Sequence, residues 1–196
     1  MPSPPDDATV IRESVPDPER FALIFDRHGP AIQRYLARRL GADVADDLTA
    51  ETFLTAFHKR RRYDQTRPDA RPWLYGIATN LVSRHRRAEV RWYRLKQAVP
   101  PERDQHSHAD EVAAQVTAQA MGRLLAVALA ELAERDRDVL LLIAWEGLAY
   151  DEVAAALDIP VGTVRSRLNR ARRKVREVLD APEHATTTKE EVSRNG

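Results

Sequence analysis

A single proline near the carboxyl end of the chain limits how this sequence can fold more than any other residue. Pro160 separates two stretches, 148–157 and 161–179, whose apolar side chains recur every three or four residues, as in amphipathic helices. A proline lacks the backbone donor that a helix interior needs, and its ring clashes with the preceding turn. We therefore predict two short helices joined by a tight turn, which is the arrangement of a helix-turn-helix.

The second of these helices carries its charge on one side. The side chains that we predict to be buried are Val161, Val164, Leu168, Ala171, Val175 and Leu179. The rest of the stretch 162–176 contains seven basic residues and no acidic residue. A solvated helix usually mixes both signs, because opposite charges four residues apart stabilise it. DNA phosphates would supply the missing negative charge, although a merely solvated helix is an alternative that this pattern leaves open.

Composition favours a wholly helical chain. The 196 residues include only 7 glycines and no cysteine, which excludes disulfides, thiolate zinc sites and a thiol nucleophile. The net charge of +1 says little about partners, so the distribution of charge matters more. The longest apolar run, 139–145, is too short to cross a membrane. The amino terminus lacks the features of a secretory signal, so we expect a cytoplasmic protein without membrane insertion.

Helical periodicity also divides the chain into segments. We predict helices over 17–28 and 32–40, separated by Gly29 and Pro30, and over 43–63 and 73–95, separated by a proline-containing loop. The expected fold is all-α, with two small helical domains joined by a flexible linker. The expected boundaries are a flexible tail at 1–16, a domain at 17–96, the linker at 97–120, the helix-turn-helix domain at 121–181 and a flexible tail at 182–196.

Two patches of opposite charge lie in the first predicted domain. Asp43, Asp47 and Glu51 share one helical face. They are consistent with a metal site, with favourable charges at a helix start or with a surface for a basic partner, but no histidine lies at matching spacing. From 58 to 95, basic residues interleave with aromatic ones, a composition that suits single-stranded nucleic acid. Within this patch, Trp73 could instead belong to the core, and Asn80 is unfavourable inside a helix unless it forms a hydrogen bond.

Three stretches together resemble a known family. They are DDLTAETFLTAF (46–57), RPWLYGIATNLVSRHRR (71–87) and GLAYDEVAAALDIPVGTVRSRLNRARRKVREVL (147–179). In order and spacing they are similar to the extracytoplasmic-function (ECF) sigma factors of the sigma-70 family, over about 17–179. The resemblance implies a promoter-recognition subunit of RNA polymerase that is not an enzyme and needs no cofactor or metal. Its partners would be the polymerase core and promoter DNA, both as duplex and as melted non-template strand.

The resemblance also implies roles for particular residues in the first domain. Asp47, Glu51 and Phe53 match the segment that docks on the clamp helices of the polymerase β′ subunit, with Ala50 where the family usually has glutamine. The loop and helix that follow match the part that recognises the −10 element, where a base is flipped out of the duplex at a cost of a few kcal/mol. The residues expected there are Tyr63, Arg67, Trp73, Asn80, Arg84 and Arg87.

In the second domain, the helix after Pro160 would read the −35 element, and the domain would also contact the β flap. The residues expected at the DNA are Thr163, Arg165, Ser166, Arg167, Asn169, Arg170 and Arg173. Ala149 and Asp158 depart from the serine or threonine cap and the glycine-like residue that are usual in the family. Many members also bind an anti-sigma protein, a partner that no feature of this sequence demands.

Two other functions compete with this interpretation. A dimeric helix-turn-helix regulator would bind duplex DNA without docking on polymerase, and it would not need the acidic and aromatic patches of the first domain. A helical enzyme would use the carboxylates between Asp43 and Glu51 with a metal ion, and the absence of matching histidines counts against it.

Overall fold

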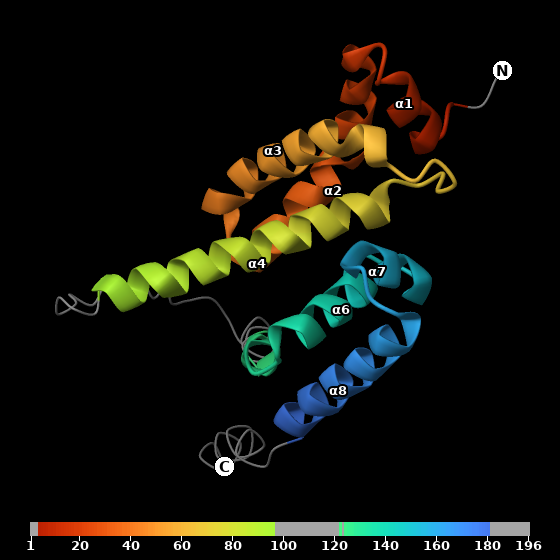
Figure 1. The fold of residues 1–196 in the computed structure, drawn as a ribbon. Helices are drawn as coiled ribbons and strands as arrows, with labels where there is room; N and C mark the ends of the chain where they lie inside the picture. Colours follow the sequence, from red (N-terminus) through yellow and green to blue (C-terminus); the bar gives the residue numbers. More distant parts are fainter. Residues whose placement is uncertain (1–3, 97–121, 123, 181–196) are drawn as a thin grey trace, which may run out of the picture. The chain divides into compact units, whose positions relative to one another are not determined.

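A computed structural model describes residues 4–96, 122 and 124–180 (Figure 1). The predicted linker (97–120) and carboxyl-terminal tail (182–196) lie outside the described residues. All regular structure within the described ranges is helical, which confirms the all-α prediction. By their contacts these residues form two compact units, one with 4–96 and 142–161 and the other with the remaining described residues. The domain boundaries expected from the sequence stay a prediction.

The first unit is built on three long helices that lie side by side (Figure 1). They are α2 (Ala22–Leu40), α3 (Ala42–Lys59) and α4 (Arg71–Lys96). Their apolar faces meet in a common core, and burial of this surface is the main force that holds the helices together. Buried side chains in this core include Ile24, Ile32, Leu36, Leu48, Phe53, Leu74 and Val82.

Helix α2 is continuous where the sequence predicted a break. Pro30 lies inside the helix, so the prediction that Gly29 and Pro30 separate two helices was wrong. An interior proline removes one backbone hydrogen bond and destabilises a helix. Ile24 and Ile32, on either side of it, are nearly inaccessible to solvent. Both side chains are buried only if the helix continues, and this burial offsets the cost of the proline.

The predicted flexible tail was also wrong over part of its length, because it contains a helix. Helix α1 (Asp7–Glu13) begins after Asp6, whose carboxylate accepts a hydrogen bond from the backbone N–H of Thr9 at 2.8 Å. Val10 and Ile11 in this helix are fully buried. A helix of two turns is too short to show a clear period in the sequence, and it is stable here because it buries its apolar side chains.

Two short 3-10 helices also belong to this unit. η1 (Pro18–Phe21) leads into α2, and η2 (Arg60–Arg62) follows α3. The predicted helix over 43–63 therefore ends as an α-helix at Lys59. Residues 63–70 then form the loop that leads into α4, and Figure 1 shows this loop beside α1.

The second unit contains a helical segment at 124–130, the first part of α6 (Glu134–Ala144) and most of α8 (Val161–Leu179). Arg137 satisfies the open carbonyls at the end of the first segment. Its guanidinium donates to the carbonyls of Leu129, Ala130 and Leu132 at 2.7–2.9 Å. None of the helices in the described residues is long and apolar enough to cross a membrane.

Candidate functional site

The turn before α8 has the geometry that the sequence predicts. Helix α7 (Tyr150–Leu157) ends at Asp158, whose φ of 51° and ψ of 53° lie in the left-handed region. Aspartate adopts this conformation more readily than most residues other than glycine, so it can replace the glycine expected there. At the other end of α7, the Glu152 carboxylate accepts a hydrogen bond from the Ala149 N–H at 2.6 Å. Glu152 thus provides a cap that the alanine side chain cannot form.

Helix α8 presents one apolar and one polar face. Val164, Leu168 and Ala171 are buried as predicted. Val178 is the buried residue of the last turn, whereas Val161, Val175 and Leu179, which we expected in the core, are only half-buried. Of the residues expected at the −35 element, Arg165, Ser166, Asn169, Arg170 and Arg173 are exposed, and Thr163 and Arg167 are half-buried. The predicted DNA-reading residues of the helix therefore lie mainly on its solvent side.

Part of the basic charge on α8 is balanced by acids from elsewhere in the same unit. Asp136 of α6 accepts two hydrogen bonds from the Arg170 guanidinium, each 3.0 Å long. Lys174 forms an ion pair with Glu131 at 2.9 Å. The hydrogen bond to Asp136 raises the pKa of Arg170, and the hydrogen bond to Glu131 raises that of Lys174. Asp136 and Glu131 would therefore compete with DNA phosphates for Arg170 and Lys174.

Arg165 and Arg167 differ from Arg170 in this respect. Neither has an ion-pair partner among the described residues. Arg173 forms an ion pair with Glu177 at 3.6 Å. This distance is longer than in the Arg170 and Lys174 pairs, and both side chains are largely exposed. Arg165 thus combines exposure, an uncompensated charge and a place in the first turns of α8, which makes it the strongest candidate for contact with a DNA base.

The predicted docking residues of α3 do not share one environment. Asp47 is exposed, and Glu51 is half-exposed and forms an ion pair with Arg84 of α4. Phe53 is buried, with its ring edge-to-face against Phe25 at a centroid distance of 4.9 Å. Phe53 therefore lies in the core of the domain, whereas Asp47 and Glu51 lie at its surface.

Sequence reasoning missed the apolar part of this surface. Phe25 is 48% exposed and Leu54 is 56% exposed. Phe25 also lines an open hollow of about 370 Å³ between α2 and α3, together with Gly29, Pro30, Gln33, Asp46, Thr49 and Ala50. The periodicity of α2 places Phe25 on its apolar face, but only the packing of α3 determines that its ring stays half-open to solvent.

The residues expected at the −10 element fall into a buried pair and an exposed group. Tyr63 is buried, and its ring lies 4.9 Å from that of the half-buried Trp73. The Tyr63 hydroxyl is 2.7 Å from the Arg67 carbonyl and 3.1 Å from the Asp69 carbonyl. Burial, followed by the nearby carboxylates, raises the pKa of Tyr63 above its usual range, so the phenol remains a donor.

The exposed group of predicted −10 residues lies along α4 and the preceding loop. Asn80 points to solvent on a helix whose neighbouring positions are buried, and Arg87 is exposed further along. Arg84 is paired with Glu51, as described above, and Arg67 with Asp64 at 3.3 Å. The structure thus brings Tyr63 and Trp73 together and leaves Asn80 and the arginines as separate surface groups.

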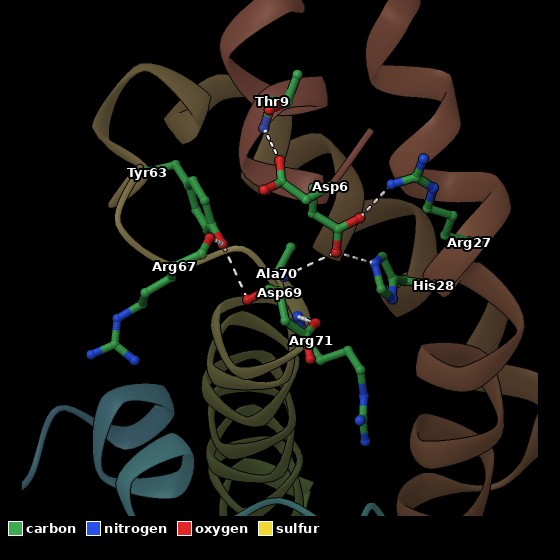
Figure 2. Close-up of polar contacts among 10 residues, drawn as sticks. Asp6, Thr9, Arg27, His28, Tyr63, Arg67, Asp69, Ala70 and Arg71 are labelled. Carbon is green, nitrogen blue, oxygen red and sulfur yellow. Dashed lines mark hydrogen bonds and ion pairs between the residues drawn. The ribbon is translucent and has the colours of Figure 1, made fainter. Parts of the chain in front are cut away.

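A second polar cluster, which the sequence analysis did not predict, lies beside Tyr63. The Asp7 carboxylate lies within hydrogen-bond distance of Arg27, His28 and the backbone N–H of Ala70. Figure 2 draws these three labelled partners with dashed lines to that carboxylate, which carries no label there. Burial alone would raise the pKa of Asp7. Hydrogen bonds from His28, Ala70 and Arg27 outweigh this effect and lower that pKa from 3.8 to about 2. The cluster joins α1, α2 and the start of α4.

This cluster is also the part of the described structure where potential metal ligands gather. Ligand atoms of Asp7, His28 and Asp69 lie within 4.8 Å of one another. However, the Arg27 guanidinium is only 2.8 Å from the Asp7 carboxylate and would repel a cation. Within the described ranges, the carboxylates from Asp43 to Glu51 form no such group. The geometry therefore favours a structural hydrogen-bond cluster over a metal centre.

The chain matches two models of one protein family. Residues 24–91 match the family model "Sigma-70 region 2", and residues 122–175 match "Sigma-70, region 4". The ECF RNA polymerase sigma factor SigC of Mycobacterium tuberculosis (strain CDC 1551 / Oshkosh) is 36% identical over 145 residues, which cover 72% of this chain and 73% of SigC.

Two solved structures have a similar fold. One is CnrH in complex with the cytosolic domain of CnrY, with a TM-score of 0.62, 27% identity and coverage of 89% of this chain and 97% of CnrH. The other is the sigma factor RpoE in complex with the anti-sigma factor NepR from Bartonella quintana. It has a TM-score of 0.60, 23% identity and coverage of 82% of this chain and 97% of RpoE.

Two matched regions in this order define a sigma-70 type transcription factor. The chain belongs to the ECF sigma factors of that family and is an RNA polymerase sigma factor, which binds the polymerase core and promoter DNA to initiate transcription. The match to region 2 also counts against the dimeric helix-turn-helix regulator, which has no need of such a region.

Proposed function

We propose that this sigma factor grips a promoter at two sites, with residues 17–96 at the −10 element and residues 121–181 at the −35 element. The proposed linker, 97–120, joins the two domains and lets them bind at the separation that the promoter dictates. The proposal includes a cytoplasmic location, where the polymerase works, and a role in binding and not in catalysis. A regulator of the anti-sigma class is a further proposed partner, by resemblance to the family.

The observation that carries the −35 assignment is the division of α8 into two faces. Val164 and Leu168 are buried, so Arg165, Ser166 and Asn169 are directed to the solvent side in the first turns of the helix. Arginine can form two hydrogen bonds to a guanine edge, whereas serine and asparagine can contact several bases. We assign base reading to these three residues. Thr163, Arg167 and Arg173 are assigned to the DNA backbone. Arg170 can join either group once it leaves Asp136.

For the −10 element, we assign contact with melted DNA to the exposed residues and support to the buried ones. Asn80, Arg84 and Arg87 lie on the solvent side of α4, and Arg67 lies in the preceding loop. Arginines bind the phosphates of a single strand, and an amide can pair with the edge of an extruded base. The half-buried Trp73 offers an edge for stacking, and Tyr63 holds the loop beside it.

For docking on the β′ clamp helices, we assign the charge to Asp47 and Glu51 and the apolar contact to Phe25 and Leu54. The hollow between α2 and α3 is lined largely by apolar groups, and Asp46 lies at its rim beside Gln33, 3.2 Å away. A surface with a partly exposed aromatic ring next to acidic residues is typical of an interface with a basic partner. The β flap is the proposed second contact on the polymerase, through residues 121–181.

The test is in vitro transcription from a promoter library with purified core polymerase and the full chain. We expect initiation that depends on bases at both the −10 and −35 positions. Glu51→Arg should abolish initiation and the capture of core polymerase by the immobilised chain, since it reverses the charge of a docking residue. Glu19→Arg, an equal change in η1 away from the docking surface, is the matched control and should retain both. No initiation by the wild-type chain, or full core binding by Glu51→Arg, would contradict the proposal.

A further inference from the structure

Helix α1 lies outside both family-model matches, yet it is firmly attached to the region 2 domain. The match to region 2 begins at residue 24, whereas α1 covers Asp7–Glu13. Val10 and Ile11 are fully buried, and the Ser14 carbonyl accepts a hydrogen bond from Arg60 at 3.3 Å. A segment of this kind is a fixed part of the domain, so its polar contacts can act on the residues around it.

Two of these contacts run from Asp7 to the loop before α4. The Asp7 carboxylate accepts a hydrogen bond from the Ala70 N–H at 3.0 Å, and the Asp7 N–H donates to the Pro68 carbonyl, also at 3.0 Å. Two bonds from one residue thus hold the last three residues of the loop. These bonds join positions that are about sixty residues apart, since Asp7 and Ala70 are separated by 63 positions.

Asp7 is itself held by two neighbours on α2. The Arg27 guanidinium donates to one carboxylate oxygen at 2.8 Å, and the His28 Nε2 lies 2.7 Å from the other (Figure 2). The Asp7 side chain is only 9% exposed. A buried carboxylate with this many partners has one preferred orientation, because any other would leave a charge or a donor unsatisfied.

The other contacts of the loop are local and come from Tyr63, Asp64 and Asp69. The Asp64 carboxylate accepts hydrogen bonds from the backbone N–H and hydroxyl of Thr66 and from the Arg67 guanidinium, at 2.7–3.3 Å. The Tyr63 hydroxyl reaches the Arg67 and Asp69 carbonyls, and the Asp69 carboxylate accepts a hydrogen bond from the Arg71 N–H at 2.8 Å at the start of α4. Between these anchors Gln65, Thr66 and Arg67 are exposed. The loop therefore has a fixed base and a tip that is presented to solvent.

We propose that Asp7 is a positioning residue for recognition of the −10 element, because it holds the 63–70 loop in the shape that meets melted promoter DNA. This inference rests on the proposed function of the loop. Asp7 does not touch DNA in this proposal. It acts through Pro68 and Ala70, and it makes the amino-terminal helix a working part of the promoter-reading domain. Tyr63 acts in the same way from inside the loop.

The test uses holoenzyme assembled from core polymerase and the full-length chain. Single-stranded DNA with the preferred −10 bases, taken from the library experiment, is compared with DNA in which those bases are replaced one at a time. The ratio of the two affinities measures −10 discrimination. Asp7→Ala should lower this ratio about tenfold, because a base contact contributes a discrimination of this order only when it is well aligned. Asp7→Asn, which keeps one acceptor oxygen, should lower it less.

Asp6→Ala is the matched control. It removes the cap of the same helix, which Asp6 provides to Thr9, but no contact with the loop. It should lower the melting temperature of the chain while leaving −10 discrimination within twofold of wild type. Discrimination at the −35 element and affinity for core polymerase should be unchanged in all three variants, because the hydrogen-bond partners of Asp7 are Arg27, His28, Pro68 and Ala70, and none of these is assigned to either function.

The outcomes separate this inference from the proposed function. The inference is overturned by one combination of results. In it, wild type discriminates −10 bases, Arg67→Ala reduces the ratio of affinities, and folded Asp7 variants keep that ratio. Asp7 would then have only a structural role. If wild type shows no −10 discrimination, the proposed function of the loop fails first. Should Asp7→Ala not fold, Asp7→Asn decides, and a ratio within twofold of wild type would overturn the inference.

Discussion

The two proposed DNA-binding surfaces of this sigma factor are held in place in different ways. On α8 the helix itself sets the direction of each side chain, because Val164 and Leu168 must face the core. The 63–70 loop has no such period, and hydrogen bonds from Asp7, which lies far away in the sequence, hold its last residues. A DNA-binding surface on a helix can therefore be predicted from the nearby sequence. One on a loop depends on contacts with distant residues that hold the loop in place.

Arginines next to both proposed DNA-binding surfaces form ion pairs with acidic residues of the protein itself. Arg170 of α8 forms a two-bond pair with Asp136, whose side chain is only 13% exposed. Arg84 of α4 meets Glu51, whose side chain is 38% exposed. Both arginines stay largely open to solvent, so DNA phosphates can replace their acidic partners. The protein's own acids thus lower the net positive charge of both surfaces and still leave the arginines accessible to DNA.

The largest effect is expected from a helix residue without such a partner. Arg165→Ala should weaken binding to the preferred −35 duplex by about 2 kcal/mol and relax the preference for one base. Arg176→Ala, in the last turns of the same helix, is the control and should weaken binding to all sequences alike. Fluorescence anisotropy with matched and substituted duplexes checks both. Equal losses on every duplex for Arg165→Ala would show that it binds only phosphate.

An intermediate effect on stability is expected when the pH is lowered and the Asp7 carboxylate, which holds the loop, becomes protonated. The pKa of Asp7 is lowered to about 2, below the usual 3.8, so its ionised form stabilises the fold at pH values above about 4. This stabilisation is lost as the pH falls through 4 towards 2, and it amounts to at most about 2 kcal/mol.

Urea unfolding at pH 5 and pH 3 measures this loss. Wild type should be more stable than Asp7→Asn at pH 5, and the difference should shrink at pH 3. Asp26→Asn, on an exposed part of α2, is the control for the general effect of removing a carboxylate. A difference between wild type and Asp7→Asn that is independent of pH would mean that the ionised carboxylate does not stabilise this cluster.

The smallest effect is expected from release of Arg170. Asp136→Asn removes the charge that holds the guanidinium, so one more cation becomes available to DNA phosphates. The slope of log affinity against log salt should become steeper by about 0.9 for duplex DNA. Glu89→Gln, on the exposed surface of α4, is the control and should leave the slope unchanged. An unchanged slope for Asp136→Asn would mean that this ion pair does not compete with DNA.

Sequence reasoning was most accurate where a local rule decides the structure. The break at Pro160, the two helices on either side of it and the helix over 73–95 all follow from the chemistry of a few neighbouring residues. It was wrong at Pro30 and at α1, because burial against distant helices overrode a local breaker and a weak local pattern. The same limit applies to Phe53 and Phe25. Each lies on the apolar face of its own helix, but Phe53 is buried and Phe25 is half exposed.

The sequence by itself determined that the chain is helical, where its last two helices meet a turn and which face of α8 is basic, because these follow from periodicity and from the chemistry of proline. Only the tertiary structure decided that Asp136 holds Arg170, that Glu51 meets Arg84 and that Asp7 fixes the loop before α4. Those contacts join residues that are 33 to 63 positions apart. No short-range pattern encodes such pairs, because packing of the helices brings them together.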